Sequence, residues 1–203
     1  MSEDTLREWN ETAKYWTRHR HTIRSMFAPL TRALIEQAGI VHGQSVLDVA
    51  GGAGEPSLTI AETVGAQGSV MCTDPIAEML AAAEADAHDR GLTNVQFRTC
   101  AADALPFADD VFDVVVSRLG AMFFPDPLAA LKEMLRVTKP GGRVALAVWH
   151  KSELNPFCYI VTDVVSRHVA SPPAEPDAPN AFRFAEEGKL SGILENAGGT
   201  NVV

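Results

Sequence analysis

Short apolar runs alternate along the chain with longer segments in which apolar residues recur every three or four positions. A short run between turn signals is typical of a buried strand, and the longer period is typical of an amphipathic helix. On this basis five strands are predicted, at residues 46–49, 69–73, 95–99, 111–117 and 143–149. Helices are predicted between them at residues 56–64, 76–90 and 127–137, with a Lys-Pro-Gly-Gly turn at residues 139–142.

This alternation predicts the α/β class. Strands joined by helices form right-handed crossover units, which build a Rossmann-like, doubly wound, mostly parallel sheet. The predicted strands are apolar on both faces, as in Val114, Val115 and Val116, which suits a sheet covered by helices on both sides. In such sheets ligands bind beyond the carboxyl ends of the strands, where the strand order reverses. We therefore expect the functional site at that edge.

The whole chain, residues 1–203, is predicted to form one domain. Residues 1–43 are predicted to be a helical, aromatic-bearing lid, followed by a ligand-binding core at residues 44–150. Residues 151–203 are predicted to add a helix at 156–169, a proline-rich loop at 171–179 and a helix at 186–197. Residues 201–203 are expected to begin a further strand and then stop, so a terminal antiparallel hairpin is expected to be truncated.

Charge narrows the classes of partner. The 203 residues include 26 Asp and Glu against 17 Lys and Arg, a formal net charge of −9. A nucleic-acid binder needs a basic face that displaces counterions from phosphates, and a protein held on anionic lipid needs a similar face. The composition therefore predicts neither partner.

The lack of a targeting signal and the pattern of the cysteines predict a cytoplasmic protein. No apolar run approaches the roughly 18–20 residues of a membrane helix, and the acidic start at residues 2–4 is not followed by an apolar block. Cys72, Cys100 and Cys158 are odd in number and widely spaced. They predict buried thiols in a reducing compartment, with neither disulfides nor a metal site.

A glycine-rich turn carries the chemistry. From Val46 the chain reads VLDVAGGAGEPS, a strand that enters a loop and then a helix opened by Pro56. Such a loop brings backbone N–H groups close to a ligand, although packing alone is an alternative. A P-loop would need a Lys-Ser/Thr pair after the last glycine, and the chain has none there. A dinucleotide fingerprint would need Gly or Ala where Ser57 stands.

Acidic residues at the strand ends indicate which ligand the loop receives. They are Asp48, Glu55, Asp74 and Asp103, and the loop itself contains neither Lys nor Arg. This set would repel a pyrophosphate but suits a ligand with a positive centre, an amino group and ribose hydroxyls. S-adenosylmethionine has those features and no phosphate. Asp74 is predicted to accept hydrogen bonds from the ribose hydroxyls, and capping of the helix at residue 76 is its alternative role.

Four stretches resemble the class I S-adenosylmethionine-dependent methyltransferases, most closely the group that contains the ubiquinone/menaquinone biosynthesis methyltransferases. They are VLDVAGGAG from Val46, VMCTDPIAEML from Val70, ALPFADDVFDVVVSRLG from Ala104 and LKEMLRVTKPGGRVAL from Leu131. Their order and spacing are far more specific than one glycine loop. The resemblance covers roughly residues 15–203 and implies methyl transfer from S-adenosylmethionine to a small-molecule acceptor.

The resemblance also implies cofactor-binding positions. The methionine part would be held by Asp48, facing the ammonium group, and by the loop Ala50, Gly51, Gly52, Ala53 and Gly54. The adenosine part would meet Asp74 at the ribose and Pro75, Ile76, Ala101, Ala102 and Asp103 around the adenine.

Further implied positions and two departures complete the cofactor site. Ser117 would border the cofactor, and Tyr15 would close over it. Ala50 stands where the family often has glycine. Ala101 stands where the family usually has Asp or Asn, so that contact to the adenine amino group is expected to be lost or taken over by Asp103.

The acceptor is expected above the ends of the fourth and fifth strands. Candidate lining residues are Tyr15, Trp16, His19, Arg118, Leu119, Met122, Phe123, Phe124, Trp149 and His150. His150 has the best position for a general base, but an ordinary loop histidine is the alternative, and no catalytic residue is assigned. The basic run at residues 18–21 is either an attraction for an anionic acceptor or a solvated helix face.

Two other functions stay open on the sequence. One is a non-catalytic S-adenosylmethionine-binding protein or an inactive truncated fragment. The other is a dehydrogenase, which tighter binding of NAD would favour. The acceptor atom and the oligomeric state are not specified by any motif.

Overall fold

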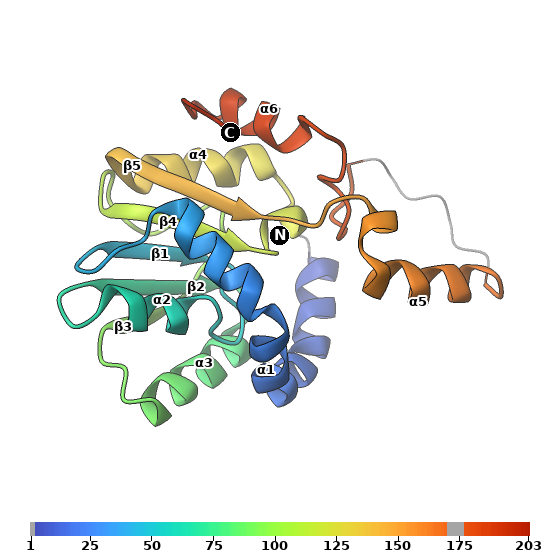
Figure 1. Ribbon diagram of the computed structural model, residues 1–203, viewed down its shortest axis with the longest axis horizontal. Coiled ribbons are helices and arrows are strands. Elements are labelled where there is room, and N and C mark those ends of the chain that lie inside the picture. The colour runs from blue at the N-terminus through green and yellow to red at the C-terminus, as the bar shows by residue number, and fades with distance from the viewer. Residues whose placement is uncertain (1–2, 170–176) are drawn as a thin grey trace.

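The computed structural model of the chain describes residues 3–169 and 177–203, and the side chains of these residues except 3–5, 157–159, 161 and 162 (Figure 1). The five strands are β1 (Ser45–Val49), β2 (Ser69–Asp74), β3 (Val95–Thr99), β4 (Phe112–Arg118) and β5 (Thr138–Ala147). The α-helices are α1 (Glu3–Ala38), α2 (Ser57–Val64), α3 (Ala77–Asp89), α4 (Pro127–Val137), α5 (Pro156–Ser166) and α6 (Lys189–Asn196). Two short 3-10 helices are η1 (Ala121–Phe123) and η2 (Ser152–Leu154).

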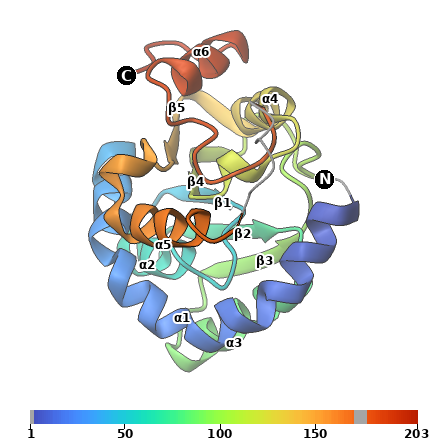
Figure 2. The same ribbon diagram turned by 90° about the vertical axis from the view of Figure 1, so that its right-hand side faces the viewer.

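The strands form one parallel sheet in the order β3-β2-β1-β4-β5, which confirms the predicted Rossmann-like α/β fold. The chain moves outward from β1 to β3 and then returns to place β4 on the other side of β1. This reversal creates the switch point at which ligands bind in doubly wound sheets. Figure 2 looks toward the carboxyl ends of the strands and shows α1 running around them.

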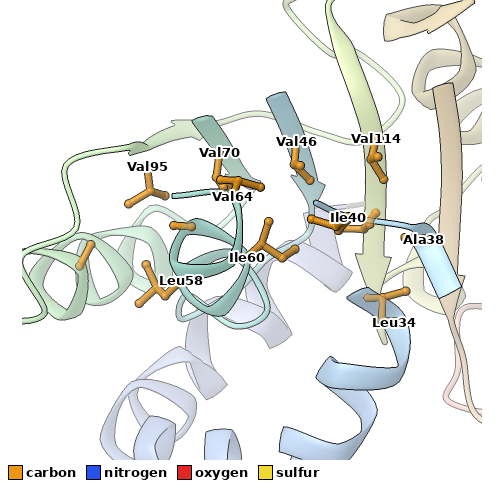
Figure 3. Close-up of a cluster of buried hydrophobic side chains, with 13 residues drawn as sticks. Leu34, Ala38, Ile40, Val46, Leu58, Ile60, Val64, Val70, Val95 and Val114 are labelled. Atoms are coloured by element: carbon orange, nitrogen blue, oxygen red, sulfur yellow. The ribbon is translucent and has the colours of Figure 1, made fainter. Parts of the chain in front are cut away.

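A row of valines crosses the sheet on the face covered by α2 (Figure 3). Val95, Val70, Val46 and Val114 are successive register partners on β3, β2, β1 and β4. Each is buried, and they pack with side chains of α2 and the end of α1, namely Leu34, Ala38, Leu58, Ile60 and Val64. β-branched residues pack well on a pleated surface, so this row joins four strands to one helical layer.

The other face of the sheet has its own core. Leu47 and Val115 point to this side, because successive residues of a strand face opposite ways. They pack with Leu131 and Met134 of α4, and α6 lies over the same cluster. Two-sided burial explains why the strands are apolar at consecutive positions.

Strand β5 differs from its prediction. It begins at Thr138 and ends at Ala147, so residues 139–142 belong to the strand and Trp149 does not. The register advances from Thr138 to Arg143 on β5 while it advances only from Phe112 to Val114 on β4. The intervening residues therefore bulge outward, which is how a Lys-Pro-Gly-Gly turn is accommodated inside a strand.

The C-terminal part corrects one expectation and leaves another untested. Residues 201–203 lie outside all five strands of the described structure, so the prediction that they begin a strand is wrong. Most of the proline-rich loop predicted at residues 171–179 lies outside the described residues. In the described parts of the chain, no helix combines the length and the hydropathy needed to cross a bilayer.

We predict that Val46→Ala lowers the free energy of unfolding by about 2 kcal/mol, because it leaves a cavity in the centre of the valine row. Val46 has no exposed surface, whereas Val41 is 57% exposed. Val41→Ala is therefore the matched control, with an expected change within about 0.5 kcal/mol. Urea denaturation measures both, and equal losses would contradict the role of the row.

Candidate active site

A cavity opens at the switch point of the sheet. Its walls come from α1, the loop after β1, the ends of β2 and β4, and the segment after β3. The empty space measures about 1230 Å³, part of it open to solvent. The cavity is the candidate ligand site, because ligands of doubly wound sheets bind at the switch point beyond the carboxyl ends of the strands.

Asp48 lies behind the loop wall at the end of β1 and is completely buried. Its Oδ2 accepts hydrogen bonds from the Ser57 backbone N–H (3.1 Å) and the Ser57 hydroxyl (2.6 Å). Its Oδ1 is buried without a hydrogen-bond partner. Burial raises the pKa of Asp48 to about 6, and the Ser57 hydrogen bonds and the Arg118 charge only partly offset this. The carboxyl group is thus poised to receive one more donor.

The loop after β1 is pressed against β2, which explains its glycines. A Cβ on Gly51 would lie 2.6 Å from Cys72 Sγ and 2.7 Å from Asp48 Oδ2, which leaves no room for a side chain. The Gly51 N–H donates to the Thr73 carbonyl (2.9 Å). Gly51 is therefore required by the packing of the loop on β2, and the loop residues 50–53 line the cavity with small side chains or none.

Asp74 organises both the loop and the start of α3. Its Oδ2 accepts from the Gly52 N–H (3.0 Å) and its Oδ1 from the Ile76 N–H (2.8 Å). Burial raises the pKa of Asp74 to about 6 despite these two hydrogen bonds. The N-cap residue of α3 is Ile76, so Asp74 orders the approach to the helix without being its cap. Its carboxyl group also lines the cavity.

The structure brings most of the predicted cofactor residues together. Those on the cavity wall are Ala50, Gly51, Gly52, Ala53, Asp74, Pro75, Ala101, Ala102 and Asp103. Asp48, Gly54 and Ser117 are buried and do not line the cavity. The contact of each residue with the cofactor remains a prediction.

Helix α1 forms the opposite wall with one face. The cavity-lining residues of α1 recur one or two helical turns apart, so they share one face of the helix. They are Trp9, Trp16, Arg20, Ile23, Arg24 and Phe27. The Trp9 ring meets Phe123 of η1 edge-on, with ring centroids 5.1 Å apart. The contact between Trp9 and Phe123 thus holds this part of α1 at the cavity.

Tyr15 is not on that face. Its side chain is 57% exposed, and its ring lies beside the Lys14 ammonium group. Sequence analysis singled out Trp16 but missed Trp9, Ile23 and Phe27. The helical period of the N-terminal segment, followed from Trp16 in both directions, is the signal that finds them.

The acceptor candidates divide in the same way. Trp16, Arg118, Leu119, Phe123 and Phe124 line the cavity. Met122 is buried in the core under α4, and Trp149 packs against Phe27 with ring centroids 5.9 Å apart. His19 and His150 are exposed, and His150 Nδ1 accepts from the Lys151 N–H. The structure therefore does not place His150 at the cavity as a base.

We predict that Ala50→Gly raises the free energy of unfolding by about 1 kcal/mol. Ala50 has φ +60°, a left-handed conformation that costs a residue with a Cβ about 1–2 kcal/mol and glycine little. Thermal and urea denaturation of the two proteins measure the gain. A loss of stability would show that the Ala50 methyl group contributes packing that outweighs the strain.

The two buried acids make a second prediction, for the pH dependence of stability. Each has a pKa of about 6 in the folded protein, against an ordinary value of 3.8. Between these values the folded state binds more protons than the unfolded chain, so the free energy of unfolding falls as the pH rises from about 4 to about 6. Asp48→Asn should make this decline shallower in urea denaturation, and an unchanged slope would contradict the assignment.

Comparison with known proteins gives the family. The ubiE/COQ5 methyltransferase family matches residues 28–162. An uncharacterized protein of Mycobacterium bovis is 47% identical over 124 residues, which are 61% of this chain and 44% of the relative. The ubiquinone/menaquinone biosynthesis C-methyltransferase UbiE of Serratia proteamaculans is 34% identical over 182 residues, covering 84% of this chain and 72% of that protein.

A solved structure agrees with these matches. The S-adenosylmethionine-dependent methyltransferase from Aquifex aeolicus superposes with a TM-score of 0.63 at 25% identity, covering 83% of this chain and 78% of that one. The chain spans less than half the length of the mycobacterial relative. Because the family match covers more than half of this chain and the UbiE relative is 34% identical over most of it, the chain belongs to the ubiE/COQ5 methyltransferase family.

Proposed function

We propose that this protein transfers a methyl group from S-adenosylmethionine to a small-molecule acceptor. The observation that carries the proposal is the division of one cavity into two unlike walls. One wall is the loop of small residues with the carboxyl groups of Asp74 and Asp103, and the other is the aromatic face of α1. The first suits a cationic nucleoside, and the second suits an apolar acceptor beside it.

The residues of the first wall fit the cofactor. Behind this wall, Asp48 Oδ1 is a buried acceptor without a partner, and its carboxyl group would attract an ammonium group held at the loop. Asp74 lines the cavity and would accept hydrogen bonds from ribose hydroxyls, and the small residues of the loop beside it would let a ligand rest close to the backbone. When bound, S-adenosylmethionine supplies a methyl group on a sulfonium, an electrophile with a good leaving group.

The protein's share of the chemistry is alignment and exclusion of water. Holding two reactants in line gives effective molarities of up to about 10⁵–10⁸ M, which can supply much of the rate acceleration of a displacement reaction. Trp9 packs against both Trp16 and Phe123, and these three rings line one side of the cavity, where they would limit the access of water to bound reactants. The titratable side chains of the described cavity wall are carboxylates, arginines and the Cys100 thiol, and burial raises the pKa of that thiol. This set suits an acceptor that reacts without a strong base.

The decisive measurement of the proposal has two parts. Isothermal titration calorimetry compares S-adenosylmethionine, S-adenosylhomocysteine and NAD as ligands. Release of S-adenosylhomocysteine is then followed with a panel of small phenols, quinols and amines. Tighter binding of NAD would favour a dehydrogenase, and binding without any turnover would favour the non-catalytic alternative.

We predict that Asp74→Ala weakens S-adenosylhomocysteine binding more than tenfold. The substitution removes charge-assisted hydrogen bonds, each of which contributes about 1.5–3 kcal/mol. Asp89→Ala, at an exposed site on α3, is the matched control and should leave the dissociation constant unchanged. Calorimetry measures both variants, after thermal denaturation has shown that each is folded. An unaltered dissociation constant in Asp74→Ala would mean that this residue only orders the loop and α3.

A further inference from the structure

Two arginines on the cavity wall have a buried nitrogen without a hydrogen-bond partner. They are Arg20, on the inward face of α1, and Arg118, at the end of β4, and in each case the nitrogen is Nε. Buried polar groups in folded proteins are almost always paired, and a charged group that is not paired calls for a ligand or ion. The two guanidinium groups therefore indicate that an anion belongs in the cavity.

Arg118 is a fixed cation. Its Nη1 donates to the Thr31 hydroxyl (2.7 Å) and its Nη2 to the Glu55 carbonyl (2.9 Å), while its guanidinium lies 5.7 Å from the centre of the Phe27 ring. Both hydrogen-bond acceptors are neutral. Burial lowers the pKa of Arg118 from the ordinary arginine value, although Asp48 and Glu55 partly offset the effect. The charge of Arg118 is thus incompletely compensated by the protein.

Arg20 differs from its neighbour on the same helix face. Arg24 lies 3.2 Å from a Glu55 carboxylate oxygen and 3.8 Å from one of Glu62, so the protein itself neutralises it. Arg20 donates from Nη1 to the Thr17 carbonyl of its own helix (3.0 Å), and no carboxylate in the described structure pairs with it. An arginine one helical turn from a paired one is thus left with a free charge facing the cavity.

The surroundings of Arg20 define the rest of the ligand. Trp16 precedes it by one turn on the same face, and Ile23 and Phe27 follow it by one and two turns. Apolar walls of low polarisability strengthen the attraction between a cation and an anion. The acids proposed to suit the nucleoside, Asp74 at the end of β2 and Asp103 in the segment after β3, line the cavity from elements other than α1. A flat apolar body with a negative group matches this half of the site.

We propose that the methyl acceptor is an anion, a flat apolar molecule with a carboxylate, and that Arg20 is the residue that selects it. This inference rests on the proposed function, since it names the acceptor class of the same site. A carboxylate also occurs in the methionine part of S-adenosylmethionine. The two sources share one chemistry, and the experiment below separates them.

The test compares an acid with its neutral amide. 1-Naphthoate and 1-naphthamide are titrated by calorimetry into the 203-residue chain, with and without saturating S-adenosylhomocysteine. We expect the naphthoate to bind at least tenfold more tightly than the naphthamide, as a charge-assisted hydrogen bond predicts. Arg20→Gln should reduce this preference to about twofold, and Arg20→Lys should restore part of it. Arg18→Gln, which removes a charge at an exposed position two residues away, should keep it.

Three outcomes would overturn the proposal. Equal affinities for acid and amide, or no binding of naphthoate at millimolar concentration, would show that the site does not select an anion. A preference that survives in Arg20→Gln would assign selection elsewhere. Weaker S-adenosylhomocysteine binding in Arg20→Gln with an unchanged acid preference would assign the arginine to the cofactor's carboxylate. Failure of S-adenosylhomocysteine to bind the wild-type protein would instead contradict the proposed function. The titrations of naphthoate and naphthamide without S-adenosylhomocysteine test the anion preference independently of that result.

Discussion

The site depends on the burial of Asp48 beneath a loop that consists of glycine and alanine, residues 50–54. One carboxylate oxygen binds both the backbone and the hydroxyl of Ser57, which fixes the first turn of α2 to the end of β1. The other oxygen stays without a partner, and desolvation raises the pKa of the group to about 6. A buried acid in this state is costly to the fold and gains from a donor. The cost is consistent with a position kept for binding, since an apolar residue would pack there more cheaply.

The rest of the cavity extends this constraint in two directions. Toward β2, Thr73 and Asp74 hold the loop through its backbone, so the loop cannot move without breaking hydrogen bonds to the sheet. Toward the helices, Glu55 joins Arg24 of α1 and Arg90 at the end of α3. The loop wall and the α1 wall of the cavity are therefore parts of one connected structure. A change in the position of α1 would therefore disturb the ion pair between Arg24 and Glu55, next to the loop.

Sequence reasoning succeeded where chemistry and local pattern coincide. The glycine loop, the strand ends and the acids beside them follow from the alternation of apolar blocks and from which residues tolerate close backbone approach. It failed where direction in space decides. Tyr15 and Trp16 are adjacent in the chain, yet about 100° of helix rotation puts one in solvent and the other on the cavity. Asp74 is the last residue of β2, whereas β5 stops at Ala147, three residues before the exposed His150.

The α1 wall of the cavity also differs from the loop wall in its relation to the family. The family match begins at residue 28, so it includes the glycine loop, Asp74 and Arg118 but stops short of Trp16, Arg20 and Phe27. The glycine loop and the strand ends proposed to bind the cofactor thus lie inside the matched range, whereas the face of α1 proposed to select the acceptor lies outside it. A fold of this kind can keep one cofactor while its N-terminal helix changes the acceptor. For that reason the acceptor of this protein is better inferred from the charges on α1 than from the substrates named for its relatives.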